Sequence, residues 1–192
     1  MNAIEVKDIT KKYDNFRLNH VSLQIPEGTI YGLIGENGAG KTTLINCILG
    51  LVQPNYGDVV VLGSDNFINE VELKDQLGFV INDMGIPNIL TVDKIEEIFS
   101  KIYKHWDHIQ FEKLLKQFEI DEEEKYETLS LGNKMRIAIA IALSHNAKLL
   151  VLDEPMNALD PAIRAEVVEL LIEYTRQEDH TILISSHIVT DL

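Results

Sequence analysis

The chain has 192 residues, 45% of them hydrophobic and 25% charged, which is ordinary for one globular domain. Its 31 acidic residues outnumber its 17 basic residues and give a net charge of -14. This excess of acid argues against nucleic acid as the main partner, because nucleic-acid binding depends on Lys and Arg at the phosphates. The single cysteine, Cys47, cannot form an internal disulfide, which fits a reducing cytosol.

The sequence contains no recognisable targeting or membrane-spanning signal. Residues 1–15 lack the apolar core of a signal peptide. The longest apolar run, residues 137–143, is far shorter than the roughly 20 residues that cross a bilayer. We therefore expect a soluble, cytoplasmic chain that reaches a membrane only through a partner.

The first third of the chain is expected to be rich in strands. Five segments have the alternating or continuously apolar character of strands: residues 3–9, 16–25, 29–35, 57–63 and 77–81. A turn at Pro26, Glu27 and Gly28 leads into the third segment, and a glycine-rich loop follows it. A short helix, which Gly50 ends, comes next.

The middle of the chain changes to a helical period. Residues 91–106 and 107–120 carry apolar side chains at helical spacing and charged side chains on the remaining face. Residues 121–127 form an acidic run that is expected to be a solvated loop or helix end. This stretch resembles an insertion into an α/β core more than a separate domain.

A further helix is predicted for residues 130–146. Ser130 is well placed to be its N-cap, because a serine hydroxyl can accept a hydrogen bond from a backbone N–H of the first turn. Ile137, Ala138 and Ile141 lie at spacings that allow them to face inward together. The helix is therefore expected to pack against the rest of the protein.

The last third alternates strand, helix and strand, at residues 148–153, 161–179 and 181–187. Pro161 suits the first helical position, and Asp160 suits the cap before it. Strand, helix and parallel strand in succession imply an α/β sheet with helices on its faces.

The glycine-rich loop "GENGAGKT", at residues 35–42, matches G-x-x-x-x-G-K-[ST] between an apolar strand and a helix. Its glycines let successive backbone N–H groups point at a phosphate, and the helix N-terminus adds partial positive charge. Lys41 is expected to reach the β- and γ-phosphates, and the Thr42 hydroxyl is expected to bind Mg²⁺. The alternative is a chance glycine turn, which the flanking strand and helix disfavour. Nine loop residues are expected to contact the nucleotide: Gly35, Glu36, Asn37, Gly38, Ala39, Gly40, Lys41, Thr42 and Thr43.

Two adjacent carboxylates, Asp153 and Glu154, end the apolar run of residues 149–152. If strands 29–35 and 148–153 lie side by side in a parallel sheet, their C-terminal ends meet at one edge. Asp153 would then face Mg²⁺, and Glu154 would hold the attacking water and take its proton. The alternative is that both are surface acids at a strand end.

Several motifs together resemble those of ATP-binding cassette (ABC) proteins. Residues 128–143, "TLSLGNKMRIAIAIAL", are similar to the family's signature segment, and residues 149–161 are similar to its Walker B region. Residues 157–160, "NALD", resemble the D-loop, and His187 resembles the switch histidine. Tyr13 stands where the family has an aromatic side chain that stacks on adenine. These motifs follow one another in the family's order.

The resemblance implies a head-to-tail dimer with two ATP molecules between its subunits. Ser130 and the backbone of Gly132 would bind the γ-phosphate of the nucleotide held by the other subunit. His187 would contact the γ-phosphate and orient the water with Glu154. Asp160 would lie at the dimer interface and also cap its helix.

The sequence departs from the family's pattern at several positions. Leu131 replaces a glycine of the signature segment, and Asn133 replaces its glutamine. Asn82 stands where the family has a glutamine that approaches Mg²⁺ or water, and its amide could do the same. Tyr13 could instead cap a strand of the β layer. After residues 185–192, "SSHIVTDL", the family normally continues with another helix and closing strands, so we expect a truncated chain or a fragment.

The expected fold class is α/β: a phosphate-loop NTPase core, mainly a parallel sheet flanked by helices, with an N-terminal antiparallel β layer and an inserted α-helical subdomain. Residues 1–192 are expected to form one ABC ATPase domain. In this division, 1–82 and 146–192 form the β layer and the RecA-like core, and 83–145 form the helical subdomain with the signature segment.

The resemblance implies an ATPase subunit of an ABC transporter, with ATP and Mg²⁺ as cofactors. Its expected partners are a membrane-spanning subunit and a second nucleotide-binding domain in a homodimer, and its expected place is the inner face of the cell membrane. The sequences of the phosphate loop and the signature segment are most similar to those of bacterial exporter subunits. Two alternatives stay open: a soluble cassette ATPase acting on ribosomes or DNA, and a regulatory cassette with little turnover.

Overall fold

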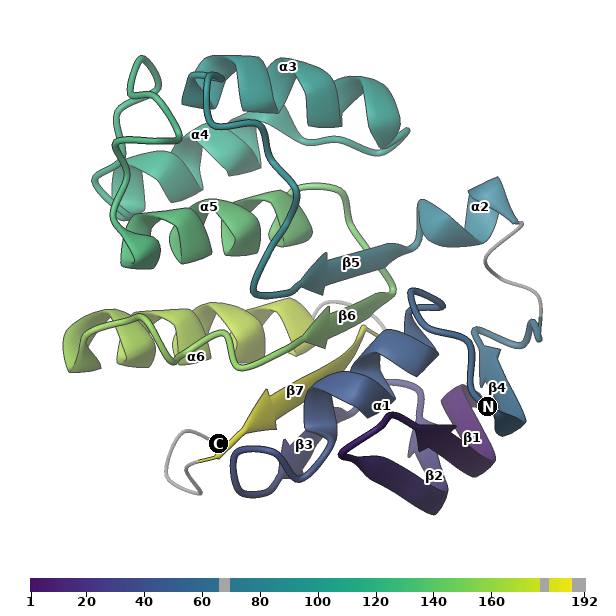
Figure 1. Cartoon of the computed structure of the whole chain (residues 1–192). Helices are drawn as coiled ribbons and strands as arrows, with labels where there is room; N and C mark the ends of the chain where they lie inside the picture. The colour runs from purple at the N-terminus through teal and green to yellow at the C-terminus, as the bar shows by residue number, and fades with distance from the viewer. Residues whose placement is uncertain (66–69, 177–179, 188–192) are drawn as a thin grey trace.

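The computed structural model describes residues 1–65, 70–176 and 180–187. Its elements in chain order are β1 (Asn2–Lys12), β2 (Arg17–Pro26), β3 (Ile30–Ile34), α1 (Lys41–Ile48), β4 (Tyr56–Val61), α2 (Val71–Lys74), β5 (Leu77–Val80), α3 (Val92–Ile102), α4 (His108–Gln117), α5 (Leu131–Leu143), β6 (Leu149–Leu152), α6 (Pro161–Arg176) and β7 (Thr181–Ser186) (Figure 1). The predicted elements are present; of the helix expected over 161–179, residues 177–179 lie outside the described residues, as do residues 188–192 of the expected core.

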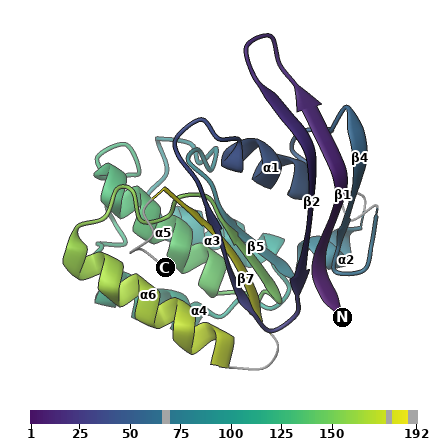
Figure 2. The same ribbon diagram turned by 90° about the horizontal axis from the view of Figure 1, so that it is seen from below.

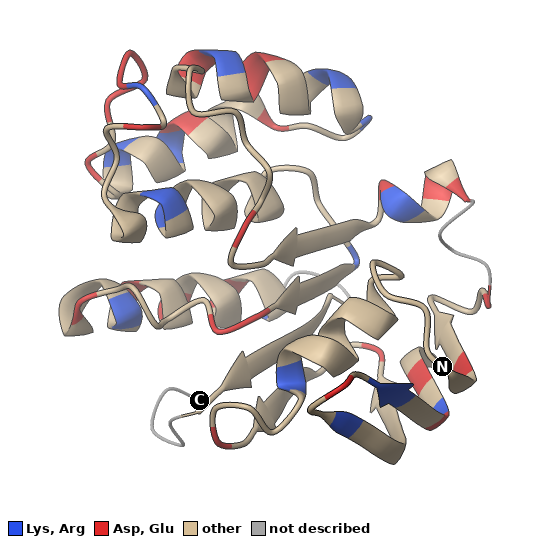
Figure 3. Cartoon of the chain, viewed as in Figure 1, with Lys and Arg blue, Asp and Glu red and all other residues tan. Residues whose placement is uncertain are grey.

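The strands form two sheets of different type. An antiparallel sheet has the order β2-β1-β4, and a parallel sheet has the order β3-β7-β6-β5. The mixed α/β fold with an N-terminal antiparallel layer is therefore confirmed. All four strands of the parallel sheet lack charged residues, and the acidic pair follows β6 directly (Figure 3).

One prediction about strand order is wrong, because β3 and β6 are not neighbours. β7 lies between them and pairs with both, Ile30 opposite Ile182 and Leu152 opposite Ile184. All six residues of β7 are buried, as expected for the central strand of a parallel sheet that is covered on both faces. The C-terminal ends of β3 and β6 still lie at one edge, since the strands run parallel.

The parallel sheet separates two hydrophobic cores. On β6, Leu150 and Leu152 face the core beneath α5 and α6, whereas Leu149 and Val151 face the core beneath α1 and the antiparallel sheet. This alternation follows from the strand period of two. Figure 2 shows α1 between the two sheets, with α5 and α6 on the other side.

The helices α3, α4 and α5 form a layer beside the parallel sheet, and α5 is the innermost of them (Figure 1). Ile137, Ala138 and Ile141 are buried as predicted, but Ile139 and Ala140 are buried too. The C-terminal half of α5, residues 137–143, is apolar all round and is enclosed by α4 and the sheet, whereas its first turns carry Lys134 and Arg136. Residues 121–127 form a largely exposed loop, as predicted. Within the described ranges, no helix combines the length and apolarity required to traverse a bilayer.

Candidate nucleotide-binding site

The loop between β3 and α1 is shaped by glycine. Gly40 has φ +101°, and a Cβ there would lie 2.7 Å from Cζ of Phe16 and 3.0 Å from Cδ1 of Leu18. Glycine is favoured at this position, because the backbone conformation is strained for any other residue and a Cβ would also require Phe16 to shift. The Gly35 N–H donates to the carbonyl of Ser186 at 3.2 Å, which fixes the start of the loop beside the end of β7.

Several backbone N–H groups of this loop remain available for a ligand. Among the residues that the structure describes, the N–H groups of Asn37, Gly38 and Gly40 donate to no acceptor. Gly38 adopts φ +82°, another conformation that favours glycine. Adjacent free N–H groups before a helix N-terminus are the donors that an oxyanion requires.

Lys41 opens α1, and its side chain is buried. The ammonium donates to the carbonyls of Gly35 at 2.7 Å and Glu36 at 3.1 Å. It also forms an ion pair with Glu154 at 3.0 Å. The cation of the loop and the second acid after β6 are therefore in direct contact.

Asp153 is almost fully buried and is held by two hydroxyl groups. Thr42 donates to its Oδ2 at 2.7 Å, and Ser185 donates to its Oδ1 at 2.7 Å. The Ser185 oxygen also accepts from the Glu154 N–H at 2.9 Å. Ser185 was not predicted to contribute to the site, although it is the first residue of the "SSH" tripeptide noted for its histidine. The correct order of the strands would have identified it.

Glu154 is the centre of a small polar network. Its carboxylate accepts hydrogen bonds from the Asn157 amide and from Lys41, and lies 3.1 Å from Nδ1 of His187. Partial burial raises its pKa, but the bonds from Lys41 and Asn157 outweigh this and hold the pKa below its usual value. Its backbone adopts φ +50°, which is uncommon for a residue with a side chain. Asn157 is a second contributor that the sequence analysis did not single out.

Two of the predicted site residues lie apart from this network. Tyr13 is about half exposed in the turn after β1, where its N–H donates to Phe16 and the Lys11 ammonium lies 5.5 Å from its ring centroid. Phe16, and not Tyr13, touches the phosphate loop at Gly40. Asn82 lies two residues beyond β5 and is exposed, and within the described ranges it makes no hydrogen bond with Thr42, Asp153 or Glu154.

The expected signature residues lie at the start of α5. Ser130 caps the helix, since its hydroxyl accepts from the Asn133 N–H at 3.1 Å. A Cβ on Gly132 would lie 2.9 Å from the carbonyl of Ala158, so this glycine allows the helix to approach the "NALD" segment closely. Leu131, the departure from the family's glycine, is 67% exposed.

Asp160 caps α6, as predicted. Its Oδ1 accepts from the N–H groups of Ala162 and Ile163, each at 3.1 Å. Its Oδ2 lies 3.5 Å from the guanidinium of Arg136 on α5. The same carboxylate thus serves the first turn of one helix and a side chain of another.

A family model described as "ABC transporter" matches residues 18–157. The chain belongs to the ABC transporter family. It is 35% identical over 192 residues to the bacitracin transport ATP-binding protein BcrA of Bacillus licheniformis, covering 98% of this chain and 63% of that protein. It is 30% identical over 190 residues to the ABC transporter ATP-binding protein YtrB of Bacillus subtilis (strain 168), covering 98% of this chain and 65% of that protein. The chain therefore spans less than two thirds of the length of these curated relatives.

The solved structures that this ABC cassette resembles include the cassette MJ0796, captured as a dimer in a post-hydrolysis state with ADP and Pi. The TM-score is 0.82 at 26% identity, and the match covers 98% of this chain and 89% of that one. Another is the structure of the ATP-binding subunit of an ABC transporter, with a TM-score of 0.85, 26% identity, and coverage of 98% of this chain and 80% of that one.

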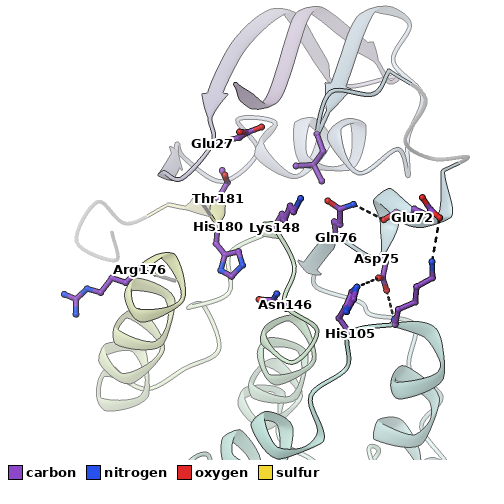
Figure 4. Close-up of a pocket in the computed structure, with 12 residues that line it drawn as sticks. Glu27, Glu72, Asp75, Gln76, His105, Asn146, Lys148, Arg176, His180 and Thr181 are labelled. Carbon is purple, nitrogen blue, oxygen red and sulfur yellow. Dashed lines mark hydrogen bonds and ion pairs between the residues drawn. The ribbon is translucent and has the colours of Figure 1, made fainter. Parts of the chain in front are cut away.

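A separate cavity of about 950 Å³ lies at the opposite edge of the parallel sheet in this cassette (Figure 4). Its lining includes Gln76, Lys148 and Thr181, which stand at or just before the first residues of β5, β6 and β7. His180 points into it, and charges of both signs surround it. Because the phosphate loop follows the C-terminal end of β3, this cavity is not part of the nucleotide site.

Proposed function

We propose that this protein is the ATP-binding and ATP-hydrolysing subunit of an ABC membrane transporter. One observation carries the proposal: Lys41 and Thr42 of the phosphate loop bond directly to Glu154 and Asp153 at the end of β6. A cation, a hydroxyl and two carboxylates converge on the edge where an α/β sheet binds ligands. Membership of the ABC transporter family supports the same activity.

The loop binds the phosphates of ATP. The free N–H groups of Asn37, Gly38 and Gly40 donate to the phosphate oxygens, together with the first turn of α1. A triphosphate oxygen is a stronger acceptor for the Lys41 ammonium than the two carbonyls that it now contacts. ATP binding therefore draws Lys41 away from Glu154 and frees that carboxylate.

The neighbouring oxygens of Thr42 and Asp153 suit Mg²⁺, which prefers hard oxygen ligands and usually binds proteins through one or two carboxylates and substrate phosphates. These two side chains would hold the ion, with Asn82 as a further candidate at the same edge of the sheet. When bound, Mg²⁺ neutralises charge on the phosphates.

Glu154 is the general base in this proposal. The bonds from Lys41 and Asn157 hold its pKa below the usual value while Lys41 contacts it. A glutamate with an ordinary pKa is also ionised at neutral pH, so the carboxylate can accept the proton of the attacking water after Lys41 has moved to the phosphates. His187, 3.1 Å from the same carboxylate, is placed to orient that water and contact the γ-phosphate. Asn157 keeps the carboxylate in one orientation.

We infer that turnover requires a homodimer of cassettes. Ser130 and Gly132 make no hydrogen bond to the phosphate loop within the described residues, so their expected contact with a γ-phosphate needs a second subunit. The exposed start of α5, including Leu131, is free to form that contact, and Asp160 lies beside it. The dimeric MJ0796 structure supports this arrangement.

The membrane-spanning partner is proposed to dock on the helical layer. An apolar groove of about 450 Å³ lies between the end of α1, α2, β5 and α3, and it exposes Leu51, Val71 and Ile102. Docking there would hold the cassette at the inner face of the cell membrane, and the segment after β5 that contains Asn82 is proposed as a second contact with the partner. The partner's own helices supply the membrane span that this part of the chain lacks.

We further propose that transport is outward, because BcrA is a bacitracin transport protein and shares 35% identity with this chain. Inside-out vesicles that contain the assembled transporter should accumulate substrate when ATP is added outside. Movement in the other sense would contradict export while leaving the ATPase proposal intact. The relatives do not favour a cassette that acts on ribosomes or DNA, nor does the net charge of -14.

The test of the function is the variant Glu154→Gln in the full-length protein. Loss of the base should lower kcat by about 10²- to 10⁴-fold, while ATP binding persists because the loop is unchanged. Light scattering on a size-exclusion column should then show a stable dimer with MgATP but not with MgADP. Glu169→Gln, an exposed glutamate on α6, is the matched control and should behave as the parent protein.

Two results would contradict this proposal. Parent protein that binds MgATP without turnover in the assembled transporter would identify a regulatory cassette instead. Unchanged kcat in Glu154→Gln would show that another group takes the proton. A monomer under saturating MgATP would contradict the dimer alone.

A further inference from the structure

Arg136 occupies an unusual position in the middle of α5. Its side chain is only 17% exposed, and its Nη1 donates to the carbonyl of Phe118, just after α4, at 3.0 Å. Its Nη2 lies 3.5 Å from the carboxylate of Asp160. Its Nε atom is buried and has no hydrogen-bond partner among the described residues. A buried guanidinium with an unsatisfied donor is costly, which calls for an explanation beyond packing.

The carboxylate that Arg136 reaches belongs to a short segment, residues 157–160, that leads from the acidic pair to α6. Figure 1 shows that α5 and α6 begin on the same side of the molecule, with this segment between β6 and the start of α6. The carbonyl of Ala158 lies so close to α5 that a Cβ on Gly132 would be 2.9 Å from it. The first turns of α5 therefore hold the segment at two points, by contact at Gly132 and by charge at Arg136.

The other end of the segment acts on the proposed base. The Asn157 amide donates to Oε2 of Glu154, and the Asn157 N–H donates to the Glu154 carbonyl at 3.2 Å. Leu159 is fixed as well, since its carbonyl accepts from Nε of Arg164 at 3.0 Å. Residues 157–160 thus form a continuous series of contacts from α5 to the carboxylate that contacts Lys41.

We propose that Arg136 is a positioning residue that couples the helical layer to Glu154 through residues 157–160. The proposal rests on the proposed ATPase function. One guanidinium joins the end of α4, the middle of α5 and the cap of α6, so the helical layer and the segment move as one body. Glu154 reaches its catalytic orientation only when the helical layer and residues 157–160 are correctly positioned against the parallel sheet. Arg136 itself touches neither nucleotide nor water.

The test is a set of substitutions assayed in the full-length transporter. Arg136→Met keeps the apolar stem but removes both contacts, and it should lower kcat about tenfold with KM for ATP unchanged within about twofold. Arg136→Lys should recover part of the loss, because an ammonium keeps the charge near Asp160 but cannot reach both partners. Lys116→Met is the matched control, because it removes an exposed cation from the neighbouring helix α4, outside the signature segment.

Hydrogen exchange supplies a readout that does not depend on turnover. Amides of residues 157–160 should exchange about tenfold faster in Arg136→Met, while residues 36–43 keep their parent rates. Asp160→Asn keeps an oxygen for the helix cap but loses the charge, and the double variant with Arg136→Met should be no slower in kcat than Arg136→Met alone.

The outcomes separate this proposal from the one it rests on. If the parent protein has no ATPase activity, the proposed function fails. If the parent is active and Arg136→Met keeps its kcat, or if the exchange change spreads over all of α5 and β6 without favouring 157–160, Arg136 is structural only and the coupling is refuted. Additive losses in the double variant would equally refute a route through Asp160.

Discussion

Ser185 holds both acidic residues of the site at once. Its hydroxyl donates to Asp153 and accepts from the Glu154 N–H, and it is itself buried at the end of β7. The second bond fixes the Glu154 backbone at φ +50°, a conformation that costs on the order of 1 kcal/mol for a residue with a side chain. One hydroxyl therefore orients the carboxylate that is proposed to bind Mg²⁺ and offsets the backbone strain at Glu154.

Ser185→Ala should lower the free energy of unfolding by about 1–3 kcal/mol, because buried groups of Asp153 and Glu154 lose their partner. It should also lower kcat, since Glu154 is no longer fixed. Urea denaturation and an ATPase assay measure the two effects. Ser100→Ala, which loses an exposed bond on α3, should change stability by less than about 0.5 kcal/mol. If Ser185→Ala and Ser100→Ala changed stability and kcat equally, Ser185 would have no special role in the site.

At the scale of single residues, the sequence predicted the side chains to which a motif assigns a chemical role. It missed the supporting roles of Ser185 and Asn157, although both lie in segments that the motifs cover. The phosphate loop, Asp153 and Glu154 were identified because each carries its chemistry in a local pattern. Ser185 and Asn157 act through contacts made by strand pairing and a turn, which no local pattern reports. Their roles follow only from the tertiary arrangement.

The junction of α5 with β5 shows how closely the elements pack. A Cβ on Gly78 would lie 2.5 Å from Cδ2 of Leu150 and 3.0 Å from the carbonyl of Ala142. Leu150 is fully buried in a packed core, so it cannot turn aside. The end of α5 can pack this closely against β5 because Gly78 has no side chain.

Gly78→Ala should therefore lower the free energy of unfolding by about 1–3 kcal/mol through overpacking. Gly63→Ala provides the comparison: its Cβ would meet nothing within 4 Å, although φ is +81°, so only backbone strain of about 1 kcal/mol is expected. Thermal and urea unfolding measure the loss of stability in each variant, and the loss should be larger for Gly78→Ala. A smaller loss for Gly78→Ala would show that the sheet and helix yield at this contact.

Element types were predictable where the hydrophobic period was strong, as in α3, α4 and the strands of both sheets. The four-residue helix α2 was not predicted, because one turn carries no period. The position of β7 between β3 and β6 was not predicted either. Strand order depends on how the whole chain folds back, and the two motif-bearing strands alone do not contain that information.

For the whole molecule, His145 joins the helical layer to the parallel sheet. Its Nδ1 lies 3.0 Å from the carbonyl of Ile141 on α5, and its Nε2 lies 3.3 Å from the carbonyl of Leu77 on β5. Its ring stacks on Tyr103, at the end of α3, with centroids 3.7 Å apart. Burial lowers the pKa of His145 against the opposing effects of the two carbonyls and of Asp75, and burial with Asp75 raises the pKa of Tyr103 to about 12. Both rings are therefore neutral at pH 7.

This arrangement makes the fold sensitive to mild acid. Below the ordinary histidine pKa of 6.5 the unfolded chain binds a proton at residue 145 that the folded chain binds only at lower pH. Stability should thus fall as pH drops from 6.5 toward the folded pKa. Urea midpoints at pH 7.5 and 5.5 should decline more in the parent than in His145→Gln, which cannot titrate. An equal decline in both proteins would assign the acid sensitivity to other groups.

The central place of β7 also has a consequence for how the protein is made. A nascent chain that has emerged as far as β6 already carries the phosphate loop and both acidic residues, yet the strand that joins β3 to β6 has not been synthesised. Pairing β3 with β7 closes a loop over most of the chain, which is slow and leaves the apolar edges of β3 and β6 exposed in the meantime. The two halves of the candidate nucleotide site therefore come together only after β7, the strand that joins β3 to β6, has been synthesised.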